Sequence, residues 1–285
     1  KTNIRMIIAI VVTYNPDYDL LTKQHDALAS QADGFVYVDN NSQEQDFISE
    51  IKDEKTEIIQ NDLNLGLAKA QNQGIALARQ KGADFVILFD QDSVPPAGFI
   101  AGLQMCYLEQ SKSHQVGLVG PAIRNMLKGN HENELGAAFK GISIKSVLVG
   151  NATEVSYCIA SGSLIPMHVL EDVGGMEEKL FIDGLDLEWC LRARSKGYKI
   201  YQTRNTYLEH CLGDGTSRRI MSHSPIREYY IMRNAVWMIK RGYIPFGYRL
   251  RKLCLSIGRL LQSITAFSGK YIKADLKGII DGIKL

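Results

Sequence analysis

A run of five apolar residues, Phe85 to Phe89, leads directly into the acids Asp90 and Asp92, and this feature constrains the fold most. An unbroken run of branched and aromatic residues is typical of a strand covered on both faces, as in a parallel sheet. In open α/β sheets the ligand lies in the crevice beyond the carboxyl ends of the strands, where both acids fall. The acid pair is either a site for a divalent cation or a solvated turn.

Strand patterns alternate with helix patterns over the first 120 residues. Strands are predicted at 7–12, 35–38, 57–60, 85–89 and 116–119, and helices at 18–30 and 67–80. Such units form parallel sheets with right-handed crossovers, so we predict an α/β fold with a mostly parallel, Rossmann-like central sheet and helices on both faces. Four strands would then end at one edge, in one cleft, with the polar segments Thr13 to Asn15, Asp39 to Ser42, Asn61 to Asn64 and Asp90 to Asp92.

The pattern becomes β-rich from about residue 137 to residue 166. Residues 142–149 alternate between apolar and polar, and residues 154–159 follow after a Gly-Asn turn, which predicts a hairpin laid against the first sheet. Small residues come next. Among them Ser161 and Gly162 would allow the backbone to approach a ligand closely.

A helix is predicted to start at Asp186 and to stop at Gly197. Acids fall in its first turn and the cations Arg192 and Arg194 in its last, which matches the helix dipole at both ends. Asp186 is therefore either an ordinary acid at a helix start, which contributes roughly 0.5–1 kcal/mol, or a catalytic carboxylate.

Two further polar residues have alternative roles. Asp39 heads the turn after the second strand, where it either forms an Asx turn or accepts a hydrogen bond from a pyrimidine ring N–H. His210 follows a predicted strand at 199–202, and it either packs in the interior or joins the acid pair as a ligand of Mn²⁺. The run from Asn64 to Gly74 is neither a dinucleotide fingerprint nor a P-loop, although Asn64 could hydrogen-bond a ligand.

The five cysteines are scattered and odd in number, without any C-x-x-C spacing. This argues against a disulfide framework and a zinc site and favours a reducing cytoplasm. Residues 6–12 read as a first strand rather than as a leader, and no segment has the length of a membrane-spanning helix. We expect no nucleic-acid partner.

Charge divides the chain into two parts. Residues 239–285 hold ten lysines and arginines against two aspartates, a net charge of +8, whereas residues 1–238 hold 23 basic and 29 acidic residues, a net charge of −6. We therefore predict a main domain over 1–238, with a first half at 1–120 and a second half at 121–238, and a basic amphipathic helical tail at 239–285. Such a tail contacts a membrane, forms a homodimer or packs on its own domain.

Five motifs in order resemble the inverting glycosyltransferases of family 2, which have the GT-A fold. They are Val-Val-Thr13-Tyr14-Asn15-Pro16, Val-Asp39-Asn-Asn-Ser42, Asn64-x-Gly66-x-Ala68-x-Ala70-x-Asn72-x-Gly74, Asp90-Gln91-Asp92 and Phe181-x-x-x-x-Asp186-Leu-Glu188-Trp-Cys-Leu-Arg192. The last motif, together with His223-Ser-Pro-Ile-Arg227-Glu-Tyr-Tyr230-Ile-Met-Arg233-Asn234, looks like that of bacterial rhamnosyltransferases. These enzymes build O-antigen and related polysaccharides from dTDP-rhamnose.

The resemblance implies a role for each matching residue. Thr13, Tyr14 and Asp39 would hold the base, Asp90 and Asp92 would reach the ribose and a Mg²⁺ or Mn²⁺ ion, and Asp186 would be the catalytic base. The wider candidate set adds Asn15, Asn61, Asn64 and Gln91 for the nucleotide sugar, His210 for the metal, and Ser161, Gly162, Asp183 and Arg218 for the donor and acceptor pocket.

The sequence thus predicts a metal-dependent inverting glycosyltransferase. Its donor would be a nucleotide-diphosphate sugar, and its acceptor a saccharide, lipid-linked at the cytoplasmic face of the membrane. Two alternatives stay open: a sugar nucleotidyltransferase, and a nucleotide-sugar-binding scaffold without catalysis. The first is disfavoured because Thr-Tyr-Asn-Pro stands where those enzymes carry a basic, glycine-rich loop.

Overall fold

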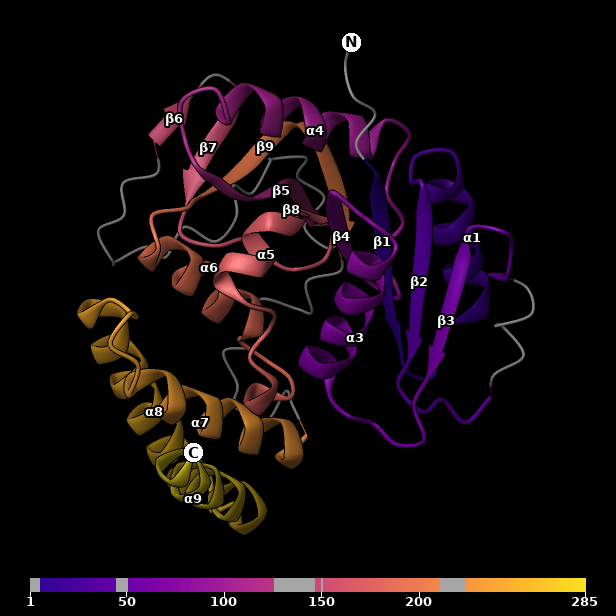
Figure 1. Ribbon diagram of the computed structural model, residues 1–285. Coiled ribbons are helices and arrows are strands. Elements are labelled where there is room, and N and C mark those ends of the chain that lie inside the picture. Colours follow the sequence, from indigo (N-terminus) through magenta and orange to yellow (C-terminus); the bar gives the residue numbers. More distant parts are fainter. Residues whose placement is uncertain (1–5, 45–50, 126–146, 150, 211–223) are drawn as a thin grey trace.

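The computed structural model describes residues 6–44, 51–125, 147–149, 151–210 and 224–285, which build a twisted sheet with helices on both faces (Figure 1). Within these ranges the sheet has nine strands in the order β3-β2-β1-β4-β8-β5-β9-β7-β6. The strands are β1 (Ile7–Thr13), β2 (Gly34–Asp39), β3 (Thr56–Gln60), β4 (Phe85–Asp90), β5 (Val116–Asn125), β6 (Val147–Val149), β7 (Ala152–Val155), β8 (Ser163–Pro166) and β9 (Lys199–His210).

The first four strands lie side by side and are all parallel, as the sequence predicts. β1 lies between β2 and β4, so that Thr13 is level with Asp39 and Val12 is level with Asp90. β1 is buried along its whole length, and alternate residues enter the hydrophobic clusters on the two faces of the sheet. The prediction that the polar segments after these strands meet at one edge is confirmed.

The second half extends the same sheet with mixed directions. β8 runs antiparallel between β4 and β5, β5 pairs parallel with β9, and β7 and β6 complete the edge as an antiparallel hairpin. The predicted hairpin therefore continues the first sheet instead of lying against it. Its second arm ends at Val155 rather than at 159, because the chain turns inward there toward β8. Residues 142–146 of the predicted first arm lie outside the described residues.

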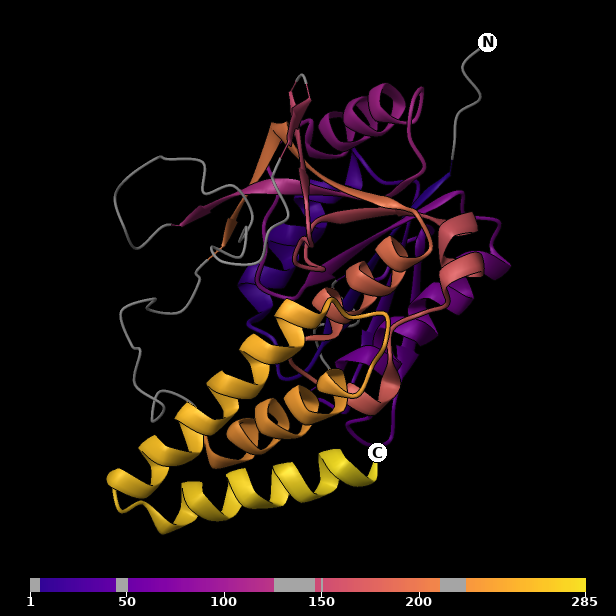
Figure 2. The ribbon, with the colours of Figure 1, turned by 90° about the vertical axis from the view of Figure 1, so that its left-hand side faces the viewer.

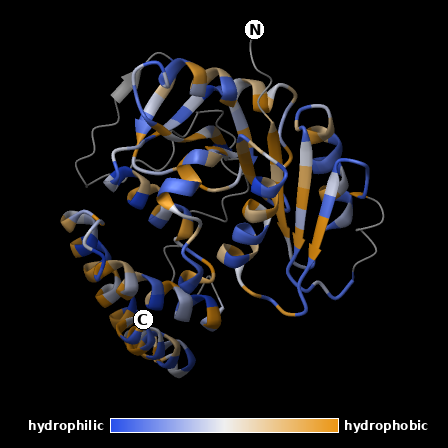
Figure 3. Ribbon diagram, in the orientation of Figure 1, coloured by the Kyte–Doolittle hydropathy of each residue, from blue (hydrophilic) through white to orange (hydrophobic). Residues whose placement is uncertain are grey.

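Helices cover both faces of the sheet (Figure 1). The helical segments are α1 (Tyr18–Ala29), α3 (Leu67–Gln80), α4 (Phe99–Gln110), α5 (Met167–Val173), the 3₁₀ turn η2 (Glu178–Leu180), α6 (Leu185–Ser195), α7 (Pro225–Ile239), α8 (Phe246–Thr265) and α9 (Gly269–Lys284). Side chains of α1 and α4 share one hydrophobic cluster, and those of α3, α5 and α6 share the other. Figure 3 shows how strongly hydrophobic the central strands are between these layers.

The C-terminal helices form a separate layer below the sheet (Figure 2). α7 packs against both α8 and α9, so the predicted boundary at 238/239 falls at the end of a helix that the tail covers. The helical character predicted for the tail is confirmed. None of the helices in the described ranges combines the length and the apolar character needed to cross a membrane.

Candidate functional site

A cavity of about 600 Å³ opens at the carboxyl ends of β1 and β4. Parallel strands place their ends at one edge of the sheet, and the loops that follow them form the cavity wall. The lining residues are Val12, Thr13, Tyr14, Asn40, Asn64, Gly66, Leu67, Asp90, Gln91, Asp92, Phe181, Ile182 and Arg227. The cavity therefore lies where the sequence places a ligand.

Asp90 and Asp92 line this cavity, and the charge of Asp186, which is not one of the lining residues, also acts on Asp90. Asp90 ends β4 and is half-buried, Asp92 follows it in an exposed turn, and Asp186 lies in the first turn of α6. Burial above all, and then repulsion from Asp92 and Asp186, raises the pKa of Asp90 to about 7. Negative charge is therefore costly at the cavity wall, and a cation would relieve that cost.

Burial also raises the pKa of Asp186, and the charge of Asp183 adds to the effect. Backbone N–H groups of Ala160 and Leu187 act in the opposite direction, because they stabilise the ionised carboxylate. A raised pKa makes Asp186 a stronger base than an ordinary carboxylate.

The described part of the chain does not supply a complete set of metal ligands. Within it, no three side chains of histidine, cysteine, aspartate or glutamate are grouped so as to hold a metal ion. Asp90 and Asp92 offer oxygen ligands of the kind that Mg²⁺ and Mn²⁺ prefer. His210 ends β9 beside Asn125 of β5, and its side chain lies outside the described residues. The acid pair would therefore need ligands from another source, such as a diphosphate.

Tyr14 and Gln91 join the loops after β1 and β4 at the cavity. The Tyr14 N–H donates to Gln91 Oε1 at 2.7 Å, and Gln91 Nε2 donates to the Tyr14 carbonyl at 3.3 Å. The Tyr14 side chain stays 49% exposed, although it is large and aromatic. Its ring is thus available to stack on a planar ligand.

Asp39 lies behind the cavity wall rather than on it. Its carboxylate is fully buried, and it accepts hydrogen bonds from the Thr13 hydroxyl at 3.0 Å and from the Ser42 N–H at 3.0 Å and hydroxyl at 2.5 Å. The bonds to Ser42 brace the turn after β2 as the Asx turn offered by the sequence would, although they reach the residue three positions on instead of two. Asn15 belongs to the same brace, because its N–H donates to Ser42 Oγ and its side chain accepts from the Gln43 N–H.

Side-chain amides connect the loops after β2 and β3. Asn40 Nδ2 donates to Asn64 Oδ1 at 2.9 Å, and Asn40 Oδ1 accepts from the Leu65 N–H at 2.9 Å. Asn61 and Gln73 exchange two hydrogen bonds of 2.8 and 2.9 Å. Asn64 lines the cavity, whereas Asn61 is buried beneath it.

The segment from 179 to 184 closes one side of the cavity in a conformation of high backbone energy. Phe181 and Asp183 have positive φ values of 61° and 66°. The Asn234 side chain of α7 holds the segment, because Nδ2 donates to the carbonyls of Leu180, Ile182 and Asp183 at 2.7 to 2.9 Å. The Arg227 guanidinium forms two hydrogen bonds, of 2.9 and 3.1 Å, to the Asp183 carboxylate.

Position 66, just before α3, requires a glycine. A Cβ there would lie 2.4 Å from Phe181 Cδ2, and the residue has a φ of 87°. The Phe181 ring stacks on Tyr230 with centroids 4.8 Å apart, and the Phe181 carbonyl accepts from the Leu67 N–H at 2.7 Å. This contact joins α3 of the first half to α7 of the second across the cavity.

The remaining candidates have different positions. Ser161 supports Asp90 from the interior, since its hydroxyl accepts from the Asp90 N–H at 3.1 Å and donates to Ser93 Oγ at 3.0 Å. Gly162 is a packing position, because a Cβ there would lie 2.9 Å from Phe99 Cζ. Arg218 lies outside the described residues.

Sequence reasoning did not single out several of the residues that line the cavity. Asn40, Phe181 and Ile182 lie in or beside quoted motifs, but nothing in those motifs tells which side chains face the ligand. Arg227 belongs to a group of arginines that also includes Arg218, and only the pairing with Asp183 distinguishes it. Side chains point to alternate faces of the sheet only along a strand. The sequence pattern therefore does not predict which way the side chains of the following loop point.

The fold is that of the GT-A glycosyltransferases, and the comparisons agree. GalNAc-T7, solved with UDP, GalNAc and Mn²⁺, has a TM-score of 0.62 at 15% identity, with 100% of this chain and 58% of that chain covered. S. aureus TarS in complex with UDP-GlcNAc has a TM-score of 0.59 at 17% identity, with 96% and 81% covered. At these identities the likeness shows the fold alone.

Sequence comparison gives the family. The model for glycosyl transferase family 2 matches residues 8–165. The dTDP-rhamnosyl transferase RfbF of Shigella flexneri is 32% identical over 98% of this chain and 95% of that protein, and an uncharacterized Mycobacterium bovis protein, Mb1552, is 28% identical over 52% and 54%. The chain therefore belongs to glycosyltransferase family 2, and it is a glycosyltransferase that uses a nucleotide sugar.

Proposed function

We propose that this glycosyltransferase transfers rhamnose from dTDP-rhamnose to a hydroxyl of a saccharide acceptor, with inversion at the anomeric carbon. The observation that carries the proposal is the acid pair Asp90 and Asp92 on the cavity wall, with Asp186 near enough for its charge to raise the pKa of Asp90. The choice of donor is supported by the 32% identity to a dTDP-rhamnosyl transferase over nearly the whole chain.

A divalent cation, Mg²⁺ or Mn²⁺, fits the acid pair. Asp92 would be its direct ligand, while Asp90 would serve both the cation and the ribose, and His210 is a third candidate ligand. A bound cation would neutralise charge on the leaving diphosphate. The raised pKa of Asp90 supports this assignment, because the carboxylates repel one another without a compensating positive charge.

Asp186 would act as the general base. As the acceptor oxygen attacks the anomeric carbon and the bond to the diphosphate breaks, the hydroxyl proton passes to the Asp186 carboxylate. Such a displacement in one step inverts the anomeric centre. The burial that raises the pKa of Asp186 supports this role, since a stronger base takes the proton more readily.

The nucleotide would bind along the ends of β1 and β2. The exposed Tyr14 ring is placed to stack on the thymine. The buried Thr13 and Asp39, together with the exposed Asn15, would hold the shape of the base pocket. Asn64 and Gln91 line the cavity with amide groups that can bond the ribose or the diphosphate. Asn61 would keep Asn64 in place through the amide network.

The acceptor would enter beside Asp186 from the side of Asp183, with Ser161 and Gly162 supporting the wall from within. We propose a lipid-linked saccharide, such as an intermediate of O-antigen or another cell-surface polysaccharide, and a cytoplasmic location. Cys106, Cys158, Cys190 and Cys254 are free thiols, which suits a reducing compartment.

Nucleotide release from a panel of donors tests the proposal. We expect purified protein with Mg²⁺ or Mn²⁺ to cleave dTDP-rhamnose faster than UDP-GlcNAc or a GDP-sugar, and a chelator to stop the reaction. A preference for a UDP- or GDP-sugar would contradict the choice of donor and leave the family assignment intact. Full activity after chelation would contradict the assignment of the metal site.

A further inference from the structure

On the C-terminal helices α8 and α9 the large apolar side chains face solvent, and the buried side carries mostly small or polar residues. On α8 the large apolar residues recur at three- and four-residue spacing along one stripe, and they are 44% to 70% exposed: Phe246, Leu250, Leu253, Ile257, Leu261 and Ile264. The residues that α8 buries are Tyr248, Ser256 and Ser263. A helix that simply packed on its own domain would turn the apolar stripe inward.

α9 repeats this arrangement. Leu276, Ile280 and Ile283 are 46%, 52% and 61% exposed, at the same helical spacing. The buried side of α9 carries Gly278 and Gly282, and a Cβ on either would lie 2.6 or 2.5 Å from a carbonyl oxygen of α7. The glycines let the two helix backbones approach closely, and Tyr271 is the one large side chain among the four residues that α9 buries.

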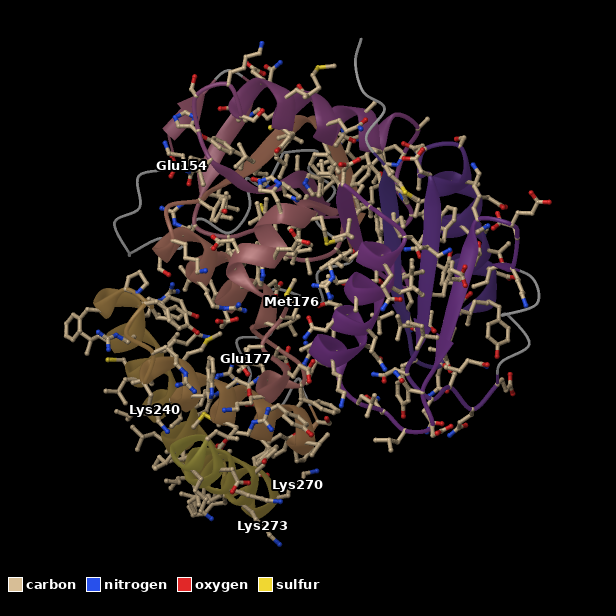
Figure 4. All side chains as sticks on the ribbon, viewed as in Figure 1. Glu154, Met176, Glu177, Lys240, Lys270 and Lys273 are labelled. Carbon is tan, nitrogen blue, oxygen red and sulfur yellow. The ribbon has the colours of Figure 1, made fainter. Side chains whose placement is uncertain are left out.

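Charge on this layer is positive wherever it faces solvent. Both acids of residues 239–285 turn toward the protein: Asp275 is fully buried and accepts from the Ser263 hydroxyl at 2.6 Å, and Asp281 accepts from the Tyr229 hydroxyl at 2.9 Å. Lys270, Lys273, Lys277 and Lys284 of α9 are exposed. Figure 4 shows the side chains of Lys270 and Lys273 projecting away from the body of the protein.

We propose that the exposed face of α8 and α9 docks on an anionic lipid membrane and lies along its surface. Apolar stripes beside lysines suit the boundary between headgroups and acyl chains, where leucine, isoleucine and phenylalanine enter the apolar layer and lysines meet anionic headgroups. A second copy of this chain is disfavoured, because two such faces would bring net charges of +8 together. The proposal concerns the surface alone and does not depend on the donor or on the metal.

Docking on this face would hold the catalytic cavity at the membrane through α7. α9 and α8 pack on α7, and α7 carries Arg227, which lines the cavity, and Asn234, which holds the segment from 179 to 184. α7 thus connects the docking face to the wall of the cavity.

Vesicle flotation of the full chain tests the proposal. We expect flotation with phosphatidylcholine vesicles that contain phosphatidylglycerol, weak flotation with phosphatidylcholine alone, and release at high salt, because salt screens the lysines. The variant Leu253→Gln, Ile257→Gln, Leu261→Gln should lose more than about tenfold in vesicle partition, since it replaces three apolar side chains that would enter the apolar layer of the membrane. Exposed positions tolerate glutamine, so this variant should keep the wild-type circular dichroism spectrum and Tm.

A matched control uses exposed apolar residues elsewhere. Met105 and Leu108 of α4 are 59% and 50% exposed, and Met105→Gln, Leu108→Gln should float like wild type. Equal flotation of the α8 variant and wild type would overturn the proposal, as would the absence of flotation with anionic vesicles. A dimer in light scattering that the α8 variant splits, without vesicle binding, would show a second copy to be the occupant.

Discussion

Asp39 and Asp90 end the two strands that flank β1, yet their surroundings differ. The carboxylate of Asp39 is fully buried and receives three hydrogen bonds from Thr13 and Ser42, whereas burial and two neighbouring carboxylates raise the pKa of Asp90 to about 7. A carboxylate with its own donors holds the fold together. A carboxylate among other carboxylates costs stability, and its presence at a cavity points to a ligand that carries positive charge.

The largest effect is expected from the replacement of Asp186. Together with Asp90 and Asp92 it makes up what we call the acid cluster. Asp186→Asn should lower the transfer rate by roughly 10²- to 10⁴-fold, because a neutral amide is too weak a base to take the proton from the hydroxyl of the acceptor saccharide. Affinity for the donor nucleotide, measured by calorimetry, should stay near wild type. Asp172→Asn is the matched control, since Asp172 forms an exposed ion pair with Lys196 and is not among the residues that line the cavity. A variant at 186 with full activity would exclude it as the base.

Replacement of Asp90 should make the metal-free protein more stable at high pH. The folded-state pKa of about 7 lies above the ordinary value of 3.8, so the ionised group destabilises the fold, and this cost grows as pH rises from about 4 to above 7. Asp90→Asn should therefore gain as much as about 4 kcal/mol at pH 8 and much less at pH 5. Denaturant unfolding with a chelator present measures the difference. An equal gain at both pH values would contradict the origin of the shift.

Asp92 sharpens the comparison because it is exposed and should act mainly through a bound ligand. Asp92→Asn should weaken diphosphate binding roughly tenfold or more in Mn²⁺ and have little effect in a chelator. Its Tm without metal should be slightly above that of wild type, because loss of this charge relieves the repulsion on Asp90. Equal losses with and without Mn²⁺ would mean that Asp92 serves the nucleotide in some other way.

A change of similar size to that at Asp92 is expected at Asp39, and it should have the opposite sign to that at Asp90. Asp39→Asn should cost roughly 1–3 kcal/mol of unfolding free energy, because the amide nitrogen that replaces one carboxylate oxygen cannot accept from the donors of Thr13 and Ser42. Thermal and denaturant unfolding measure it. A variant at 39 as stable as wild type would mean that the brace behind the cavity contributes little.

The sequence predicts the parallel half of the fold well because its signals are local. Buried strands such as Phe85 to Phe89 are continuous apolar runs, and the helix predicted at 67–80 matches α3 at both ends. The second half is harder, since β8 has four residues and takes its place between β4 and β5 through pairings distant in sequence. α4 and α7 carry weak amphipathic patterns because both of them are partly enclosed.

The same limit applies to the site. Polar residues at strand ends identify the edge, and the acids Asp90 and Asp92 lie on the cavity wall as their position suggests. The sequence cannot separate Asp39 from Asp90, because both are aspartates that follow an apolar strand. Only three-dimensional contacts show that Ser42 and Thr13 satisfy one of them, and that Asp186, 96 positions beyond Asp90, acts on the other.

Calorimetric titration of dTDP into the wild-type protein and into Asp92→Asn, in Mn²⁺ and then in chelator, tests the central claim most directly. The claim is that the acid cluster is a metal-assisted site for the diphosphate of the donor. We expect tight binding to wild type in Mn²⁺, and weak binding in the other three titrations. Binding of dTDP to wild type that is equally tight in chelator and in Mn²⁺ would contradict the claim.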